Sequence, residues 1–466
     1  MTRDCGRAAT FLILRPVLIM VILSSISAGF ALAGLSAGDI ATLREQGQKE
    51  GWTFTVGEND ATQYSLDELC GLKVPVDWQK NADFDPCVSK ANLPEAFDWR
   101  TLDGCPPIRN QRNCGSCWAF GTIGAIECNI KIKDSLTVDL SEQWLVSCNV
   151  EGWGCSGGWW AHQYFCWQGD MCGEAGAVME ADYPYAAANL TCNCPYPHSY
   201  RIASSAYIGN AYGVPDIDAM KQAIIDHGPI SAAVASSDAM HAYTGGVFNY
   251  YASGEINHGV VLVGWDDNQG KQGVWIMRNS WGSGWGEGGY MRMEYGASRI
   301  GYGAAYVNYP GAVRITTTSL PSCSVGVAYS AQLEISAGGS SIVWTDRDGS
   351  LAGAGLSLST GGLISGTPTV AGMISFVAEV HDNLGTHDEQ AYTIEASKYI
   401  DGDANADTEV NIADAVYVLN YIFRRGQPPQ PTEAAGDANC DGAANVGDVV
   451  FVITYVFNGG QGPACP

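Results

Sequence analysis

The fold is decided by residues 110–120, which read Asn110-Gln111-Arg112-Asn113-Cys114-Gly115-Ser116-Cys117-Trp118-Ala119-Phe120. Gln111 stands shortly before Cys117, a Gly-Ser turn precedes that cysteine, and an apolar stretch that predicts a helix follows it. A thiol in the first turn of a helix meets the positive end of the helix dipole, which lowers its pKa and favours the reactive thiolate. Most cysteines of secreted chains form disulfides, however, so a nucleophile at Cys117 needs partners elsewhere in the sequence.

His258 is the histidine whose surroundings suit a general base. It stands in Ile256-Asn257-His258-Gly259, directly before the apolar run 260–265, which predicts a β-strand. A ring fixed at a strand end can accept the proton of a thiol and later protonate a leaving amine. The remaining histidines lack this context, and we expect structural roles for them: His162, His198, His227, His241, His381 and His387.

The third segment of interest is Arg278-Asn279-Ser280-Trp281-Gly282. A neutral amide at Asn279 is sufficient to hold an imidazole, because a thiolate already balances the imidazolium charge. Together the three segments resemble the papain and cathepsin family of cysteine peptidases, over roughly residues 93–310. The resemblance implies an α+β papain-like catalytic domain with a helical half and a β-barrel-like half.

The same resemblance implies a role for each residue of the predicted site. Cys117 is expected to be the nucleophile, His258 its base and Asn279 the residue that orients the base. Gln111 is expected to donate a hydrogen bond to the oxyanion beside the backbone N–H of Cys117. Trp281 is expected to shield the hydrogen bond between histidine and asparagine from water, although an ordinary core tryptophan is the alternative.

Glycines near the site are expected to bind substrate. Residues 154–158 are similar to the glycine wall of the family, in which Gly157 and Gly158 pair with an extended peptide as an added strand. Gly259, together with a residue near Ala305 or Tyr306, is expected to shape the specificity pocket.

The mode of cleavage follows from a missing motif. No His-His pair occurs between Cys155 and Cys194, so the insertion that makes cathepsin B a carboxydipeptidase is absent. Endopeptidase action is therefore predicted.

Sixteen cysteines in an exported chain predict a disulfide framework with one thiol left free. Cys105 and Cys128 flank the active cysteine in a way similar to cathepsin B, but spacing alone does not settle their partners. The family resemblance predicts two disulfides, Cys114 with Cys155, and Cys148 with Cys192 or Cys194.

The N-terminal residues predict export. Arg3, Arg7 and Arg15 precede an apolar run that ends in Ala31-Leu32-Ala33, the pattern of a signal peptide over residues 1–33. A retained membrane anchor is the alternative, but the apolar run is shorter than the roughly 20 residues that a membrane span requires. We therefore expect a mature chain without a membrane span.

Residues 34–92 are predicted to be a propeptide. The run from Leu93 to Arg100 resembles the start of a mature cathepsin, and Glu68-Leu69-Cys70-Gly71 is similar to cathepsin B propeptides. Such a segment is expected to occupy the cleft until it is cleaved. A non-inhibitory extension is the alternative.

The composition changes after the predicted peptidase domain. Between Ile315 and Ala396 cysteine almost vanishes, and short Val, Ile, Thr and Ser runs alternate with Gly-rich turns, which is typical of a β-sandwich. Residues 311–398 resemble bacterial immunoglobulin-like domains, which usually act as spacers. A fold of this kind assigns no partner by itself.

Residues 399–466 repeat an acidic loop followed by an apolar segment and resemble a dockerin, a small α domain with calcium loops. Oxygen ligands at such spacing suit calcium, on which folding should then depend, and the resemblance implies a cohesin-like partner. Thr408 replaces the turn glycine of the first loop. The predicted calcium ligands are Asp403, Asn405, Asp407, Asn411, Asp414, Asp437, Asn439, Asp441, Asn445 and Asp448.

The charge balance excludes one class of partner. Lys and Arg total 24 against 49 Asp and Glu, and this net charge of -25 would repel nucleic acids. We predict a secreted or surface-associated cysteine endopeptidase that is made as a proenzyme, acts on polypeptides and needs no catalytic cofactor. The alternative is a non-catalytic binding or surface-assembly protein on the same scaffold, which a substitution at Cys117 or His258 would have indicated.

Overall fold

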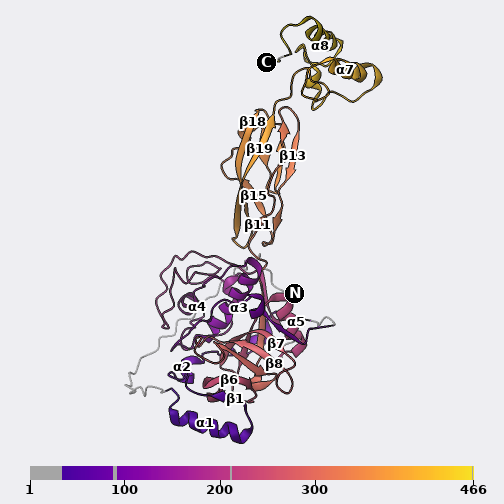
Figure 1. Cartoon of the computed structure of the whole chain (residues 1–466). Coiled ribbons are helices and arrows are strands. Elements are labelled where there is room, and N and C mark those ends of the chain that lie inside the picture. The colour runs from indigo at the N-terminus through magenta and orange to yellow at the C-terminus, as the bar shows by residue number, and fades with distance from the viewer. Residues whose placement is uncertain (1–33, 88–91, 210–212, 464, 466) are drawn as a thin grey trace. The chain divides into compact units, whose positions relative to one another are not determined.

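The computed structural model describes residues 34–87, 92–209, 213–463 and 465, so the predicted signal peptide lies outside the described residues. The chain divides into two compact units, one that ends at Ala312 and one that begins at Val313 (Figure 1). Within the described residues no helix combines the length and the apolar character needed to cross a bilayer.

The first unit contains helices and strands in separate regions of one α+β fold (Figure 1). Its helical elements are α1 (Ala37–Glu50), α2 (Leu66–Leu69), η1 (Trp78–Asn81), η2 (Trp99–Leu102), α3 (Cys117–Asp134), α4 (Glu142–Cys148), η3 (His162–Phe165), α5 (Ile217–His227), α6 (Asp238–His241) and η4 (Ala297–Arg299). Its strands are β1 (Thr53–Val56), β2 (Phe84–Asp85), β3 (Ala96–Asp98), β4 (Ser204–Ile208), β5 (Ile230–Val234), β6 (Tyr243–Phe248), β7 (His258–Asp266), β8 (Val274–Arg278), β9 (Tyr290–Glu294) and β10 (Tyr302–Asn308).

These strands form one mixed sheet in the order β1-β6-β9-β8-β7-β5-β10-β4-β2, with β3 also paired to β7. The central strand β7 is buried along almost its whole length, as its continuous apolar sequence requires. One apolar core lies around the sheet and includes Trp265 and Trp275. A second core lies around α3 and α4 and includes Trp118 and Trp144.

Helix α3 packs closely against β7, and small residues permit this approach. A Cβ atom at Gly121 would lie 3.4 Å from the carbonyl carbon of Gly259, and one at Gly124 would lie 3.2 Å from the Val261 side chain. A Cβ alone would already touch the strand, so side chains larger than alanine at either glycine would push the helix away from it. The close packing brings the first turn of α3 to the start of β7, where the predicted site residues meet.

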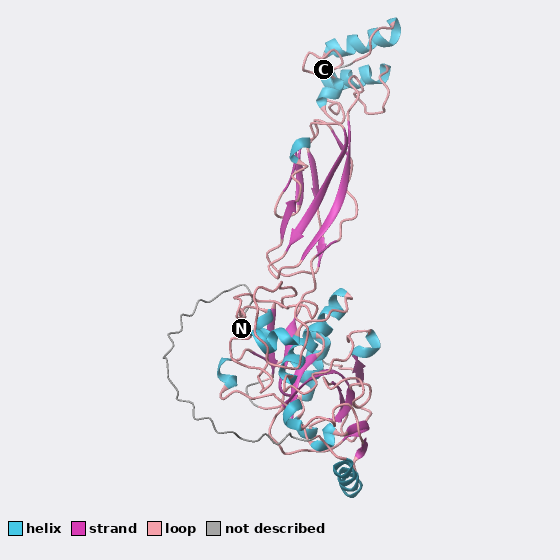
Figure 2. Cartoon of the chain, turned by 90° about the vertical axis from the view of Figure 1, so that its left-hand side faces the viewer, coloured by secondary structure: helices cyan, strands magenta, loops and turns pink. Residues whose placement is uncertain are grey.

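The second unit begins with an all-β region, which Figure 2 shows as strands up to the tail helices. Three sheets are formed, in the orders β11-β14, β12-β19-β18-β15 and β13-β17-β16. The strands are β11 (Arg314–Ile315), β12 (Cys323–Ser324), β13 (Tyr329–Gln332), β14 (Ile335–Ser336), β15 (Val343–Asp346), β16 (Leu356–Leu358), β17 (Leu363–Gly366), β18 (Gly372–His381) and β19 (His387–Ser397), with the short helix η5 (Ala352–Ala354).

The tail of the second unit contains two α-helices, α7 (Ile412–Arg424) and α8 (Val446–Asn458), and the short η6 (Glu433–Gly436). Asn411 caps α7 and Asn445 caps α8, each in a capping box with the aspartate three residues on. The two helices share a small core that includes Val418 and Val452. Each acidic loop thus leads into one helix, as its sequence predicts.

Candidate active site

Cys117 is the first residue of α3 and is fully buried. Its Sγ accepts a hydrogen bond of 3.3 Å from the backbone N–H of Gly71. Burial raises the pKa of the Cys117 thiol to about 11, although backbone N–H groups, including that of Gly259, act in the opposite direction. The sequence predicts a lowered pKa from the helix dipole, and this expectation is wrong for the covered cleft, because desolvation of the thiolate outweighs the dipole.

His258 begins β7 and is also fully buried. Both of its neighbours contact Cys117: Asn257 O lies 3.9 Å from the cysteine Sγ, and the backbone N–H of Gly259 interacts with the thiol. Burial lowers the pKa of His258 to about 4, against the opposing effect of a hydrogen bond to Asn279. The Nδ1 atom of His258 has no hydrogen-bond partner among the described residues, so one ring nitrogen remains available to take a proton.

Asn279 directly follows the last residue of β8 and holds the other ring nitrogen. Its Oδ1 lies 2.8 Å from Nε2 of His258 and also accepts the N–H of Ser280 at 2.8 Å. The Trp281 ring lies 4.6 Å from the His258 ring, centroid to centroid, and is itself buried. The indole therefore shields the hydrogen bond between His258 and Asn279 from solvent, in the place that the sequence predicts for it.

Gln111 is buried with its amide directed at the same site. Its Nε2 donates to the carbonyl oxygens of Leu69 and Cys114, both at 2.8 Å. Its Oε1 accepts the Ser280 hydroxyl at 2.7 Å, which fixes which end of the amide faces the cleft. The side chain thus already donates to a carbonyl oxygen of a peptide that lies in the cleft.

Leu69 ends α2, and the backbone of residues 70–73 then passes through the cleft. Gly158 N donates to Gly71 O at 3.0 Å, and Lys73 N donates to Gly158 O at 2.8 Å. On the opposite side, Leu72 N donates to Asn257 O at 2.9 Å. A Cβ at position 71 would overlap the carbonyl of Gly115, so only glycine passes this point. A polypeptide backbone in the cleft is therefore bound by Gly158 of the glycine wall on one side and by Asn257 on the other.

The glycines of the wall fit this backbone closely. Gly157 has a φ of +120°, which disfavours any side chain, and a Cβ there would meet Gly71 O. A Cβ at Gly158 would lie 2.7 Å from the Trp118 ring. Gly259 does not face open space: a Cβ there would lie 2.9 Å from Cys117 O and 3.1 Å from the Trp160 ring. Its missing side chain is needed for close packing beside Cys117.

Cys70 is a residue of the site for which the sequence predicts no role. Burial and the neighbouring Cys117 thiol raise the pKa of Cys70 well above its usual range. The only signal in the sequence is its position within the Glu68–Gly71 motif, which is similar to cathepsin B propeptides. In the covered cleft burial therefore favours the neutral form of both thiols and of the His258 ring.

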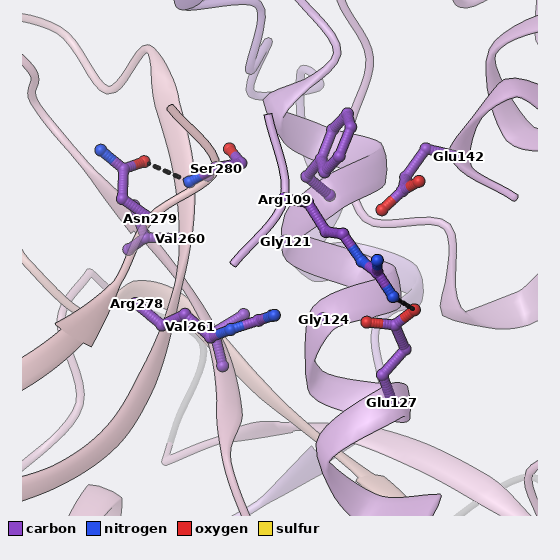
Figure 3. A pocket seen from close by; sticks show the side chains of 12 residues that line it. Arg109, Gly121, Gly124, Glu127, Glu142, Val260, Val261, Arg278, Asn279 and Ser280 are labelled. Carbon is purple, nitrogen blue, oxygen red and sulfur yellow. Dashed lines mark hydrogen bonds and ion pairs between the residues drawn. The ribbon is translucent and has the colours of Figure 1, made fainter. Parts of the chain in front are cut away.

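A pocket beside the site holds buried charges rather than reacting groups (Figure 3). Its lining includes Asn279 but neither Cys117 nor His258. Arg109 Nη2 lies 3.5 Å from Glu127 Oε1 within it. Burial and the nearby Glu127 charge raise the pKa of Glu142 well above its usual range. We interpret these residues as a buried charge cluster with a structural role, which packs beside Asn279.

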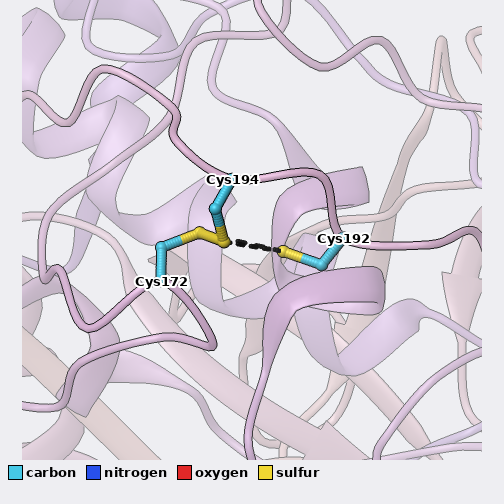
Figure 4. A group of neighbouring side chains, drawn as sticks. All are labelled: Cys172, Cys192 and Cys194. Atoms are coloured by element: carbon cyan, nitrogen blue, oxygen red, sulfur yellow. Dashed lines mark hydrogen bonds between the residues drawn. A yellow bond between two sulfur atoms is a disulfide. The ribbon is translucent and has the colours of Figure 1, made fainter.

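Disulfides fasten the helical half of the first unit. The predicted disulfide between Cys114 and Cys155 is confirmed. Of the two alternatives for Cys148, the structure has Cys192, whereas Cys194 pairs with Cys172. Figure 4 shows the Cys172–Cys194 disulfide with Cys192 beside it, whose Sγ lies 4.0 Å from Cys194 Sγ. This crowding explains why the spacing in the sequence could not separate the two partners.

The expectation of a single free thiol is wrong for the described residues. Cys105 and Cys128 contact each other as thiols, and their hydrogen bond lowers the pKa of Cys105. Of the other free cysteines, Cys87, Cys117 and Cys323 are buried, and Cys70 is partly exposed. The free cysteines of the described residues are Cys70, Cys87, Cys105, Cys117, Cys128 and Cys323.

The two acidic loops of the tail gather most of their predicted ligands. Asn405 and Asn439 donate from Nδ2 to the carboxylate of the neighbouring aspartate, at 2.9 and 3.0 Å. Asn411 and Asn445 cap the following helices, where each Oδ1 accepts a backbone N–H, and Asn445 Nδ2 also donates to the Asp441 carboxylate at 3.1 Å. Each loop places three carboxylates within 4.8 Å of one another: Asp403, Asp407 and Asp414 in the first, and Asp437, Asp441 and Asp448 in the second.

This donor set fits a hard divalent cation. Carboxylates this close repel one another, and Asp414 and Asp448 are almost fully buried, which adds a desolvation cost. Oxygen ligands with flexible geometry are those that calcium prefers. The side chains that would hold such an ion are the three aspartates of each loop, with Asn405 and Asn439 beside them.

Comparisons with known proteins agree with this geometry. A family model described as papain family cysteine protease matches residues 93–309, and one described as dockerin type I domain matches residues 401–457. Fruit bromelain from Ananas comosus is 34% identical over 252 residues, which cover 53% of this chain and 69% of that protein. Cathepsin S from Mus musculus is 35% identical over 271 residues, which cover 55% of this chain and 76% of that protein.

A solved structure is similar in the same region. Digestive procathepsin L2 proteinase from the larval midgut of Tenebrio molitor aligns with a TM-score of 0.51 and 29% sequence identity. The alignment covers 58% of this chain and 90% of that one. The similarity is thus to a proform, in which a prosegment accompanies the enzyme.

Proposed function

The chain belongs to the papain family of cysteine proteases, and from this premise we propose that it is an endopeptidase with Cys117 as nucleophile, His258 as base and Asn279 as the residue that orients the base. The observation that carries this proposal is the peptide backbone of residues 69–73, which lies against Cys117 while Gln111 donates to its Leu69 carbonyl. A substrate backbone bound in the same cleft would present its carbonyl to the same groups.

The proposed reaction proceeds in two steps. Cys117 Sγ attacks the scissile carbonyl carbon while its proton passes to Nδ1 of His258, the ring nitrogen that lacks a partner among the described residues. Gln111 Nε2 and the N–H of Cys117 stabilise the oxyanion. The imidazolium then protonates the leaving amine, and water, activated by the neutral ring, hydrolyses the acyl-enzyme. No catalytic cofactor takes part in this sequence.

We propose that residues 34–92 form a propeptide that keeps the enzyme latent. Residues 69–73 fill the glycine wall, and Gly71 donates to the nucleophile itself. The N-terminal part of this segment is also anchored at a distance, because β1 pairs with β6 over residues 53–56. Removal of the segment would expose the cleft, restore solvent to the thiol and histidine, and permit the ion pair to form.

The second unit is proposed to position the enzyme rather than to catalyse. The dockerin type I domain would bind calcium in its two acidic loops and attach to a cohesin-like protein. The strands of residues 313–397 support the proposal of an immunoglobulin-like spacer. With a signal peptide over residues 1–33, the chain would act outside the cell, free or held at the cell surface.

The test is hydrolysis of an internally quenched peptide by the acid-activated, reduced protein, with and without an epoxide thiol trap. Activity is expected in the parent protein and should fall by roughly 10⁴-fold or more in Cys117→Ala, because the nucleophile is removed. Cys323→Ala, which removes a buried thiol of the second unit, serves as the matched control and should keep full activity. No turnover, and no covalent label on Cys117 in the processed protein, would sink the enzyme proposal and favour the binding scaffold.

A further inference from the structure

Trp78 of the proposed propeptide lies in a cluster of aromatic rings. It begins η1, a few residues after the segment that covers the cleft. Its ring centroid lies 4.5 Å from that of Tyr207 and 5.6 Å from that of Trp159. The rings of Phe84 and Tyr302 follow at 5.8 and 6.2 Å. These separations are those at which aromatic rings attract one another beyond simple burial.

Three of these rings remain when residues 34–92 leave. Trp159 directly follows Gly158 of the glycine wall, Tyr207 lies on β4, and Tyr302 begins β10. A hydrogen bond of 2.8 Å from Trp159 Nε1 to the Tyr207 hydroxyl fixes the orientation of two of them. The receiving surface is therefore built into the catalytic domain and held in shape without Trp78.

The surface recognises the ring of Trp78 and not its N–H group. The indole Nε1 atom is buried and has no hydrogen-bond partner among the described residues. A buried donor without an acceptor is a cost to binding, so this site gains its free energy from ring contacts alone. A phenylalanine side chain, which lacks the donor, would make some of the same ring contacts without that cost.

Backbone contacts lie on both sides of the short helix η1 that carries Trp78. Before it, Gly71 and Lys73 pair with Gly158 of the wall. After it, β2 pairs with β4, where Tyr207 N donates to Asp83 O at 2.9 Å and Gly209 N donates to Asp85 O at 2.7 Å. Without residues 34–92, β4 becomes an edge strand whose N–H groups can bind another extended polypeptide.

We propose that Trp159, Tyr207 and Tyr302 form an aromatic subsite of the mature enzyme, which binds a Trp or Phe side chain of an extended polypeptide substrate at a distance from the scissile bond. The propeptide residue Trp78 occupies this subsite in the proenzyme. The inference rests on the proposed peptidase function, since it names a substrate feature that the same cleft would select.

The test uses a set of internally quenched peptides that share one cleavable core and carry either Trp or Ala at each successive outer position. The quantity measured is the ratio of kcat/KM for the Trp peptide to that for its Ala partner. The parent enzyme should prefer Trp by roughly tenfold at one outer position, the size expected for burial against several rings. In Tyr207→Leu and in Tyr302→Leu this ratio should fall to near one, whereas Tyr251→Leu, at a half-exposed tyrosine elsewhere, should retain it.

The outcomes distinguish a failure of the proposed aromatic subsite from a failure of the proposed peptidase function. Cleavage of every peptide with equal kcat/KM for Trp and Ala would overturn the subsite and leave the peptidase intact. Absence of turnover for all peptides would overturn the proposed function as well. Should the tyrosine variants fail to fold, full-length Trp78→Ala decides: its Cys117 should be alkylated several-fold faster than in the parent, and Trp78→Phe should stay near the parent. Equal alkylation rates in all three proteins would refute the role of Trp78.

Discussion

The cleft around Cys117 and the acidic loops of the tail both concentrate polar groups, yet they reach order in opposite ways. In the cleft, Gln111 and Asn279 hydrogen-bond to neighbours that fix their orientation, and residues 69–73 supply the backbone that fills the site. In each tail loop, three carboxylates lie within 4.8 Å of one another, and the charges share one sign. The first region is complete within its own chain, whereas we propose that a cation completes the second.

This difference indicates where each region can be switched. The cleft is switched by removing part of the chain, because the covering segment buries the thiol and suppresses its ionisation. The tail loops are switched by the concentration of an ion, because that ion compensates their charge. A change that acts on one region should leave the other almost unaffected.

The largest contrast is expected in the reactivity of Cys117. With a pKa of about 11 in the covered cleft, only about one thiol in ten thousand is ionised at pH 7, and the alkylation rate of the full chain should rise about tenfold per pH unit up to that pKa. After processing, the rate at pH 7 should be higher by roughly 10³-fold. Iodoacetamide labelling, read at Cys117 by mass spectrometry, measures both rates.

The control for this labelling is Cys117→Ala, which removes the labelled thiol and so identifies its signal, although it also removes the acceptor of the Gly71 N–H. Calcium should change neither rate, since the tail loops do not contribute to the cleft. A full chain that is alkylated at pH 7 as fast as the processed enzyme would contradict the view that residues 69–73 suppress the thiolate.

Loss of one hydrogen-bond donor should have the next largest effect. Gln111→Ala removes the Nε2 donor that now binds Leu69 O, and kcat should fall by roughly 10²–10³-fold because the oxyanion loses one partner. The matched control is Gln390→Ala, at an exposed glutamine of β19 in the second unit, which should leave kcat unchanged. A kcat of Gln111→Ala within threefold of the parent value would remove this residue from the proposed oxyanion site.

Removal of calcium should affect the tail and spare the cleft. At a calcium concentration about 100 times the dissociation constant, binding to one loop adds about 2.7 kcal/mol to the free energy of unfolding. A chelator should therefore lower the melting temperature of the tail and reduce the helical signal of α7 and α8, while short-peptide hydrolysis continues. Calorimetry beside the peptide assay measures both. If peptide hydrolysis fell together with the unfolding of the tail, the proposal that the cleft and the tail are independent would be wrong.

The parts of the fold that could be predicted are the elements with a clear local pattern of apolar residues. The apolar run after His258 predicts β7, and the stretch after Cys117 predicts α3, because each period or run is long enough to define its element. The path of residues 69–73 could not be derived in this way. Its contacts join backbone groups to Asn257 and Gly158, far along the chain, and no side-chain pattern records them.

The site was predictable by residue type and not by electrostatic state. The positions of Cys117, His258 and Asn279 follow from motifs, but the direction of the Cys117 pKa depends on burial by another segment. Asn411 and Asn445 are predicted as ion ligands from their loop positions, and their capping of α7 and α8 could not be derived from those positions alone. In both cases the contacts that decide the state of the group come from the three-dimensional structure and not from the motif.

The smallest predicted effect sharpens the comparison within the tail. Thr408 has a φ of +73° in the first loop, where the second loop has Gly442 at +95°. A residue other than glycine is strained in this region, by roughly 0.5–1 kcal/mol, so Thr408→Gly should tighten calcium binding to the first loop about two- to fivefold. Gly442→Ala should weaken the second loop by a similar factor, and titration calorimetry of both variants measures the change. Since neither substitution alters a carboxylate, equal affinities in parent and variants would show that ligand charge alone, and not the backbone turn, sets the affinity of these loops.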